Sequence, residues 1–378
     1  MDSNKNRGTR LGIVAGLMIL LLVAGQAMAQ TCVVPPSGMV GWWPGDGNAN
    51  DIVGSNHGTG TGVAYTTGKV GQAFSLAASL PYVTIADNSA LHVQELTIDA
   101  WVYFTGTVTA PKNQYFLRKW ISSDGGYGSY AGFRTSGNAI GFTVQSQTPS
   151  QYPGWRSSAS LSTDTWHHVA FTWKRLSSAT ADAADGKLYV DGTAVSTTFT
   201  PNGYNETFSI QYTNQPLFLG KTTIPSWAEP YNGLIDEVEI FNRALIADEI
   251  QAINDAGSAG KCREVDIDIK PGSDPNCFNI NGSGVIPVAI LGSEDFDVSD
   301  IDKYTLTFGD LKVRVRGKKG PLCSIEDVNE DYYPDMVCHF EDDGTSQWTA
   351  GNGTATLTGR LLEDGPGFMG TDTICVVP

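Results

Sequence analysis

Between residues 38 and 258, short apolar runs alternate with clusters of turn-forming residues. The runs are rich in Val, Ile, Thr, Phe, Tyr and Trp, and Gly, Asn, Asp and Ser separate them. This alternation is typical of β-strands joined by turns, and Asp191-Gly192 is a hairpin signal. The predicted strands are residues 82–86, 96–104, 139–145, 167–174, 187–190, 217–220 and 234–241.

One segment, residues 244–256, has a helical pattern instead. Apolar residues recur there at helical spacing, from Leu245 to Ile253, and Gly257 follows as a stop signal. A many-stranded antiparallel chain of this length is most economically a two-sheet sandwich. The sequence therefore predicts an all-β fold: a two-sheet sandwich over residues 30–262, followed by a smaller all-β domain over residues 263–378.

The smaller domain has its own strand pattern. Residues 264–270 alternate, with Val265, Ile267 and Ile269 on one face, and residues 284–291 form a near-continuous apolar run typical of a buried strand. Further predicted strands are residues 306–308, 311–316, 335–340, 353–361 and 373–377. Because no low-complexity linker separates the two domains, we expect them to pack closely.

The first thirty residues have the pattern of a secretory signal peptide. Lys5, Arg7 and Arg10 precede an uncharged apolar run over residues 11–25, and Ala-Met-Ala at residues 27–29 offers a cleavage site. The alternative is an uncleaved anchor, but the run is short for a span of about 20 residues. We expect cleavage after residue 29, a secreted location (extracellular or periplasmic), and no membrane span in the mature chain.

The charge of the chain limits its partners. Cleavage removes three basic residues and one acidic residue, so the net charge moves from −16 to −18. Such a field repels nucleic acid and anionic lipid, whereas it attracts divalent cations and leaves neutral sugars unaffected. We expect an extracellular glycan or a surface protein as partner, and no nucleic acid.

The cysteines indicate disulfides. All six follow the cleavage site, and an even count in an exported chain is typical of a disulfide framework. Cys32 and Cys262 bracket a long stretch that contains no other cysteine, so we expect these two to pair. The remaining four allow three connectivities, among which the sequence does not choose; they are Cys277, Cys323, Cys338 and Cys375.

Several motifs of the first domain resemble the bacterial LamG-like jellyroll, part of the concanavalin A-like lectin/glucanase superfamily. They are GWWPGDGNANDIVGSNHG (41–58), GKVGQAFSL (68–76), LTIDAWV (96–102), WHHVAFTW (166–173), LYVDG (188–192) and NGLIDEVEIFNRAL (232–245). The resemblance covers about residues 38–258. It implies that residues 30–262 form a jellyroll of two antiparallel sheets, and it implies a ligand-binding or adhesive role, often alongside calcium. The second domain resembles a module of secreted bacterial proteins that has no known activity, through VDIDIKPGSDPN (265–276), GVIPVAILGSEDFDV (284–298) and ATLTGRL (355–361).

A calcium loop is predicted in the second domain. Asp327, Asn329, Asp331 and Asp335 have D-x-N-x-D-x-x-x-D spacing, and calcium takes six to eight hard oxygen ligands. The spacing is similar to the calcium loops of dockerins and integrin-type repeats, although Tyr332 stands where such loops carry Gly. The alternative is a solvated acidic turn.

The resemblance implies a second calcium site in the jellyroll. Asp51 and Asp236 would supply carboxylates there, and Asn56 would supply an amide oxygen. The alternative at this loop is an Asx-turn, in which the Asp51 side chain caps the backbone.

A glucanase on this fold would need two acids on one strand face. In the run from Asp236 to Glu239, alternation places Glu237 and Glu239 on one face and Asp236 on the other. Ile235 stands at the outer acid position of the glucanase pattern, so we predict no catalytic residues and no enzyme. His167 and His168 lie beside Trp166 at a strand start, where we expect a packing role.

Sugar binding requires exposed aromatic rings. Trp155 and Trp227 lie in segments bounded by Pro and Gly, with Tyr152 and Tyr231 nearby, and loops on a rigid scaffold commonly carry recognition. Alternatively, the two tryptophans pin their loops to the sandwich. We expect Trp101 and Trp173 in the core, and at most one ring of the adjacent Trp42 and Trp43 to face inward.

Basic residues concentrate in one stretch, Lys312, Arg314, Arg316, Lys318 and Lys319. They either form a charged edge that resists strand addition or a docking face for the acidic first domain or an anionic glycan. Taken together, the sequence predicts a secreted, non-catalytic binding or adhesion protein that recognises carbohydrate. The alternatives are a structural surface protein that binds another protein and, third, a polysaccharide hydrolase.

Overall fold

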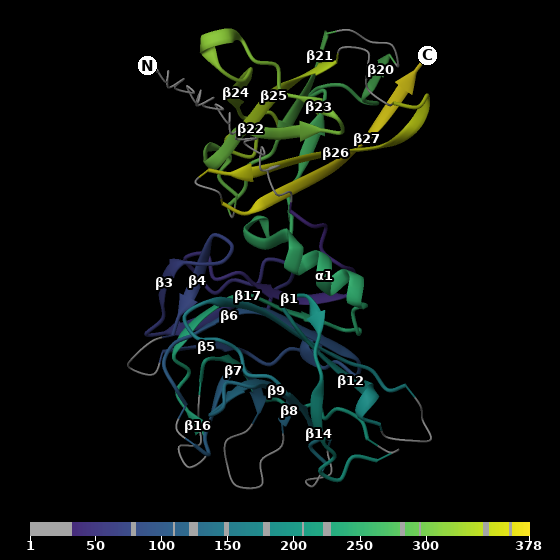
Figure 1. Cartoon of the computed structure of the whole chain (residues 1–378). Coiled ribbons are helices and arrows are strands. Elements are labelled where there is room, and N and C mark those ends of the chain that lie inside the picture. Colours follow the sequence, from purple (N-terminus) through teal and green to yellow (C-terminus); the bar gives the residue numbers. More distant parts are fainter. Residues whose placement is uncertain are drawn as a thin grey trace, which may run out of the picture.

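The computed structural model describes residues 32–76, 81–108, 110–120, 128–146, 151–176, 182–205, 208–221, 228–279, 284–294, 296–342, 348–362 and 365–378. The predicted signal peptide and Trp227 lie outside these residues. Figure 1 shows the jellyroll below, the smaller domain above, and the helix α1 (Ala247–Ala256) between them. The chain is an all-β protein, as predicted.

Two sheets form the jellyroll. In order across the first sheet are β13 (Thr193–Ala194), β12 (Gly186–Val190), β11 (Trp166–Trp173), β6 (Leu96–Phe104), β17 (Gly233–Phe241), β4 (Gln72–Ser75) and β3 (Ala64–Thr67), with β1 (Met39–Trp43) beside β17. In order across the second are β14 (Thr197–Thr200), β10 (Gly154–Ser157), β9 (Ile140–Val144), β8 (Gly128–Thr135), β7 (Asn113–Trp120), β15 (Leu217–Leu219), β5 (Tyr82–Ile85) and β2 (Gly58–Thr61), with β16 (Ala228–Glu229) beside β7.

The central strand β6 of the first sheet is buried on both faces. In β6, Leu96, Ile98 and Ala100 belong to the core between the sheets, because alternate side chains of a strand point to opposite faces. The intervening Asp99 and Trp101 point away from that core and are nevertheless buried. The outer face of this sheet is therefore covered by other parts of the chain.

The helix α1 supplies part of that cover. Its buried Ile250 and Ile253 pack with Ala170 and Tyr189 of the first sheet and with Phe241 at the end of β17. The segment beyond the helix, through the 3₁₀ turn Gly257–Ala259, leads to the second domain. The outer face of the jellyroll thus lies against the junction between the domains.

The second domain also consists of two sheets around a separate core. Its larger sheet runs β18 (Arg263–Glu264), β27 (Gly367–Val377), β26 (Gly351–Leu361), β22 (Ile301–Phe308) and β23 (Leu311–Lys312), with β20 (Cys277–Asn279) beside β27. Its smaller sheet runs β19 (Ile267–Ile269), β21 (Gly284–Ile290), β25 (Asp335–Asp342) and β24 (Cys323–Glu326). Remaining 3₁₀ turns are Ser89–Leu91, Ala183–Asp185, Val298–Asp300 and Gly317–Lys319.

Two predicted strands of this domain are not continuous in the structure, and two others begin earlier than predicted, β22 at Ile301 and β27 at Gly367. Residues 264–270 form two short strands, β18 and β19, because the first joins the larger sheet and the second joins the smaller sheet. Residues 311–316 contain only β23, since Val313 and Val315 make single bridges to Phe340 and Pro321 rather than a continuous ladder. In both places the prediction of extended chain with alternating apolar residues is confirmed, but the prediction of one continuous strand is wrong.

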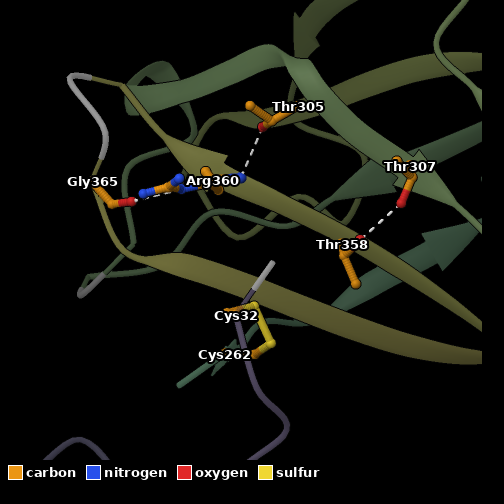
Figure 2. The surroundings of a disulfide bond; sticks show 7 residues. All are labelled: Cys32, Cys262, Thr305, Thr307, Thr358, Arg360 and Gly365. Atoms are coloured by element: carbon orange, nitrogen blue, oxygen red, sulfur yellow. Dashed lines mark hydrogen bonds between the residues drawn. A yellow bond between two sulfur atoms is a disulfide. The ribbon is translucent and has the colours of Figure 1, made fainter. Parts of the chain in front are cut away.

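Three disulfides are formed, and Cys32 pairs with Cys262, the pairing that the sequence predicts. The other two are Cys277–Cys375 and Cys323–Cys338. Figure 2 shows the Cys32–Cys262 bond next to the paired strands β26 and β27. A side chain at Gly367, the first residue of β27, would lie 2.4 Å from Cys32 Cβ, so only glycine fits there. Within the described residues, we find no helix whose length and hydrophobicity would let it cross a membrane.

Candidate functional site

A cleft of about 740 Å³ lies between the two domains. Such a volume is within the usual range of ligand sites, about 300–1,000 Å³. The cleft is lined by Val34, Pro35, Met39, Trp42, Asn50, Asp51, Ile52, Val53, Gly54, His57, Cys262, Arg263, Glu264, Val265, Ser293, Phe296, Met369, Gly370 and Thr371. These residues come from β1 and the loop that follows it, from the junction after α1, and from two segments of the second domain.

Trp42 connects the cleft to the interior of the jellyroll. Trp43 belongs to the core between the sheets, and alternation turns Trp42 to the outer face, where it is still almost fully buried. Its ring nitrogen Nε1 donates a hydrogen bond to Glu237 Oε2 at 3.1 Å. As predicted, only one of the two adjacent tryptophans faces the core.

The loop after β1 is organised by Asp51. Its Oδ1 accepts from the backbone N–H groups of Trp42 (3.0 Å) and Val53 (3.1 Å), and its Oδ2 accepts from the backbone N and Nδ2 of Asn56 (both 3.1 Å). The backbone N of Asp51 donates to His57 Nδ1 at 3.2 Å, so the proton of this ring is on Nε2. Asp51 therefore acts as a loop cap, the alternative considered for the sequence.

A cluster of ionisable side chains lies behind Trp42, on the outer face of the first sheet. Lys261 Nζ lies 2.7 Å from Glu239 Oε1 and 3.6 Å from Glu237 Oε2. Asp99 Oδ2 lies 2.9 Å from Nε2 of His168. All five side chains are buried, and we call Asp99, His168, Glu237, Glu239 and Lys261 the sealed cluster.

Burial and charge set the pKa values in the sealed cluster. Burial raises the pKa of Glu237 to about 7, against the opposing effect of Lys261. Burial also raises the pKa of Glu239 well above its ordinary value, and the neighbouring charge of Asp99 adds to this effect. Burial alone would raise the pKa of Asp99, but the charge and hydrogen bond of His168 prevail and bring that pKa to about 2. The pKa of Lys261 is raised, because its carboxylate neighbours outweigh burial.

A β-bulge changes the predicted arrangement of the acids on β17. The pairing of β17 with β6 shifts register between Asp236 and Glu239, and Glu237 has a φ of 51°. Because Ile235 and Val238 both point into the core, Asp236 and Glu237 both point away from it. The predicted placement of Asp236 on the opposite face from Glu237 is therefore wrong.

Asp236 is held apart from Asp51. Its Oδ2 accepts from the backbone N of Lys69 (2.7 Å) and Val70 (2.9 Å). Its pKa is raised by burial and by the nearby Glu237. Asp236 Oδ1 and Asn56 Oδ1 have no hydrogen-bond donor among the described residues. Hydrogen bonds do not link Asp236 to Asp51 or Asn56 in the described part of the chain, so the three predicted ligands are not brought together by shared contacts.

The acidic loop of the second domain is shaped by hydrogen bonds to its own backbone. Asp335 is buried and accepts from the backbone N of Gly292 and of Val328, both at 2.8 Å. Asn329 Nδ2 donates to Asp331 Oδ2 at 2.8 Å, and Tyr332 N donates to Asp327 Oδ2 at 3.2 Å. Tyr332 adopts a φ of 74°, the conformation that favours Gly.

Metal binding by these loops stays a prediction. Over the described ranges, no three His, Cys, Asp or Glu side chains are grouped so that they could hold a metal ion. Asp327, Asn329 and Asp331 lie on one exposed turn, whereas the Asp335 carboxylate is already used by two backbone donors. The fit of this loop to calcium is thus partial: three oxygen-bearing side chains remain on the solvent side.

Two of the four predicted aromatic ligand-binding residues are core residues instead. Trp155 is 1% exposed, lies on β10, packs against Phe171 and donates its Nε1 hydrogen to the carbonyl of Ala183 at 2.7 Å. Tyr231 is 2% exposed and donates to the carbonyl of Leu234 at 2.9 Å. Both predictions are wrong, since Pro and Gly near these rings mark strand ends rather than exposed loops.

The other predicted aromatics have different outcomes. Tyr152 is 44% exposed, and its carbonyl accepts from Asn202 Nδ2. Trp227 lies outside the described residues. Trp101 and Trp173 are buried, as predicted, and His168 packs on the Trp101 ring at 5.1 Å between centroids.

Sequence reasoning missed the sealed cluster and the cleft. Asp99 and His168 were visible as polar residues inside apolar strands, and buried charges require partners. No local signal marks Lys261 as the partner, because it follows the helix α1 by several residues and has no periodic neighbours. The cleft depends on residues from both domains, so it follows only from how the domains pack.

Residues 78–251 match the family model described as the concanavalin A-like lectin/glucanases superfamily. This part of the jellyroll is therefore similar to that superfamily, in agreement with the predicted resemblance. The match ends before the second domain begins. The comparison with curated proteins finds no match.

Several solved structures are similar to the chain. Domain 4 of an extracellular arabinanase from Geobacillus stearothermophilus, solved with arabinotriose, has 20% identity and a TM-score of 0.41, over 56% of this chain and 96% of that domain. A Trypanosoma rangeli sialidase has 14% identity and a TM-score of 0.42, over 58% of this chain and 33% of the sialidase. The binding domain of a paraclostridial mosquitocidal protein has 12% identity and a TM-score of 0.43, over 85% of this chain and 75% of that domain.

Proposed function

We propose that this protein binds carbohydrate without hydrolysing it, and that the cleft between its domains is the binding site. The carrying observation is the lining of the cleft, which includes the half-buried Phe296 and the almost fully buried Trp42 together with polar residues such as Asn50 and His57. Sugars are recognised through their apolar ring faces and their hydroxyl groups, so a mixed aromatic and polar lining suits them. The match of residues 78–251 to the lectin/glucanase superfamily model supports the same ligand class.

The position of the acids supports a non-catalytic role. A glycoside hydrolase needs two carboxyl groups that flank the scissile bond. Glu237 and Glu239 lie behind Trp42, are buried, and contact Lys261 rather than the cleft. A substrate in the cleft would have no access to them without displacement of Trp42.

A glycan array with the mature chain tests the binding proposal. We expect binding that weakens at least about tenfold in His57→Ala, which removes the Nε2 donor from the cleft; this corresponds to about 1.4 kcal/mol. His92→Ala is the matched control, because His92 lies on the jellyroll away from the cleft residues and bonds Asp87. Absence of binding to any glycan, or equal weakening in both variants, contradicts the proposal.

Release of reducing sugar from any bound polysaccharide tests the non-catalytic part. We expect no release by the wild-type chain. Release that Glu237→Gln abolishes would show that the sealed cluster opens during a reaction, and the protein would then be a hydrolase.

A second candidate function, protein binding, is favoured by the apolar rim of the cleft. Val34, Ile52 and Val53 are 63%, 39% and 49% exposed, and exposed apolar side chains around a cleft are typical of protein contacts. Ile52→Asp is expected to abolish binding to a protein partner. Binding of saccharides by the wild-type chain favours the first function, whereas binding of a protein partner without any saccharide binding favours the second.

Calcium binding is proposed for the turn that contains Asp327, Asn329 and Asp331. A cation there would relieve repulsion between the carboxylates, so we expect a higher melting temperature with calcium than with chelator. Asp331→Asn is expected to remove most of the shift. An identical melting temperature in both conditions contradicts the proposal at both predicted sites.

Export is proposed for the same protein. Three disulfides are typical of chains that fold in an oxidising compartment, and residues 1–29 have the pattern of a signal peptide. N-terminal sequencing of the protein recovered from the medium or the periplasm is expected to begin at Gln30.

A further inference from the structure

The basic stretch of the second domain forms a hairpin that begins at β23 of the larger sheet and hydrogen-bonds to β25 of the smaller sheet. Residues 311–322 turn back on themselves: Arg316 N donates to the carbonyl of Gly320 at 2.9 Å, and Leu322 N donates to the carbonyl of Arg314 at 2.8 Å. The 3₁₀ turn Gly317–Lys319 is the tip. We call residues 311–322 the basic hairpin.

The cations of the basic hairpin are exposed and largely unpaired. Lys312, Arg314, Arg316, Lys318 and Lys319 are all exposed. Among the described residues, an ion pair reaches only Arg314, whose Nε lies 4.0 Å from Glu341 Oε1. In a chain with a net charge of −16, this hairpin is a local concentration of uncompensated positive charge.

The hairpin is held in place, and an aromatic ring lies beside it. Cys323 follows its second arm directly and is bonded to Cys338 of β25. Tyr304 of β22 is 74% exposed, and a side chain at Gly320 would lie 3.1 Å from its hydroxyl, so the tyrosine borders the hairpin tip. A fixed surface loses less conformational entropy on binding than a mobile one.

We propose that the basic hairpin and Tyr304 form a binding site for an acidic polysaccharide, separate from the cleft. Lysine and arginine bind carboxylate or sulfate groups, and the exposed tyrosine ring offers an apolar face for a sugar ring. None of these residues lines the cleft. The alternative of a docking face for the jellyroll has no support, because the described contacts of the hairpin are with its own domain.

The net negative charge of the rest of the protein disfavours the binding of polyanions with a high charge density. Duplex DNA carries one charge per about 1.7 Å, so the negative body of the chain repels it more strongly than a polyuronate with one carboxylate per sugar. A hairpin whose charges served only to prevent strand addition at a sheet edge would bind a polyanion no better than other exposed cations of the chain do. The two roles therefore differ in a measurable way.

Affinity electrophoresis of the mature chain in polygalacturonate tests the proposal, with dextran as the neutral polymer. We expect retardation by polygalacturonate that is lost at high salt, since exposed charges are screened over about 10 Å at 0.1 M. The triple variant Arg316→Ala, Lys318→Ala, Lys319→Ala is expected to bind about tenfold more weakly. Tyr304→Ala is expected to weaken binding without changing the salt dependence.

The matched control removes three exposed cations from the jellyroll: Arg156→Ala, Lys174→Ala and Lys187→Ala. It changes the net charge equally and is expected to lose less than half as much affinity as the hairpin variant. No binding to polygalacturonate, equal losses in the two triple variants, or tighter binding to DNA or to anionic lipid vesicles would overturn the proposal. Binding of dextran, and glycan binding that depends on His57, test the cleft and not the hairpin. The cleft proposal and the hairpin proposal can therefore fail independently.

Discussion

The sealed cluster and the basic hairpin differ in the burial of their charged side chains. In the sealed cluster, three carboxyl groups, one histidine and one lysine are buried together on the outer face of the first sheet. In the basic hairpin, five cations are exposed, and within the described part of the chain only one of them reaches a carboxylate. Burial makes each charge depend on its partners for stability, whereas exposure leaves charge free to bind something outside the protein.

This difference indicates that the sealed cluster contributes mainly to stability and that the basic hairpin contributes mainly to binding. Lys261 lies at the junction, next to the disulfide-bonded Cys262, and neutralises acids that β17 contributes. The jellyroll is therefore completed by the segment that leads out of it. The cations of the hairpin stabilise little, because exposed ion pairs contribute only about 0–1 kcal/mol.

The largest expected effect is that of Lys261→Met. This variant leaves Glu239 and Glu237 buried without their cation, so we expect a loss of about 3–5 kcal/mol in the free energy of unfolding at neutral pH. Urea denaturation measures it. Lys187→Met is the control at an exposed position and is expected to change stability by less than about 0.5 kcal/mol. A loss below about 1 kcal/mol for Lys261→Met would mean that the cluster is open to water.

The burial of Glu237 is also expected to make the free energy of unfolding depend on pH. The folded state holds this proton up to a pKa of about 7, and the unfolded chain releases it near 4.5. The folded state binds more protons over this interval, so the free energy of unfolding falls as pH rises from about 4.5 to about 7, by about 3 kcal/mol from this group alone.

Glu237→Gln is expected to flatten that slope while it keeps an acceptor for Trp42 Nε1. Denaturation at pH 5 and pH 8 compares the two proteins. If the wild-type protein and the variant have parallel pH profiles, Glu237 titrates normally, and the cluster is not sealed.

A smaller effect is expected where β27 meets the Cys32–Cys262 disulfide. Gly367→Ala would place a methyl group 2.4 Å from Cys32 Cβ, and such overpacking costs about 1–3 kcal/mol. Gly353→Ala on β26 is the control, because a methyl group there would meet only Ile374, at 4.0 Å. Equal melting temperatures for the two variants would mean that the domains are packed less closely than described.

The smallest expected effect on stability is at the hairpin. Lys318→Ala with Lys319→Ala is expected to change the free energy of unfolding by less than about 0.5 kcal/mol, while binding of polygalacturonate weakens. A chemical denaturation curve together with affinity electrophoresis measures both quantities. A marked loss of stability would show that the hairpin cations stabilise the fold, as the sealed cluster does, and would contradict the difference proposed between the two regions.

Most strands could be predicted from the sequence, because alternation is a local property. The predicted strand at residues 96–104 coincides with β6, and the predicted helix at residues 244–256 contains α1. Local patterns also showed that Trp101 and Trp173 belong to the interior. The order of the motifs predicted the similarity to the superfamily whose model matches residues 78–251.

The candidate sites could not be predicted equally well, because they depend on distant partners. Trp155 has the same local sequence whether its neighbours are solvent or the strands β9 and β14, which in fact pair on both sides of it. The bulge at Glu237 inserts one residue and so reverses the face predicted for Asp236. Lys261 gains its role only when the junction folds onto β17.

The Cys32–Cys262 bond also determines how the protein would carry mechanical load. The two half-cystines are 230 positions apart, and the jellyroll lies between them. Tension applied on either side of this bond passes through the sulfur atoms rather than along the looped segment. Under shear or tethering the jellyroll would therefore stay folded while the second domain bears the force, and a protease cut within the jellyroll would not separate the two domains.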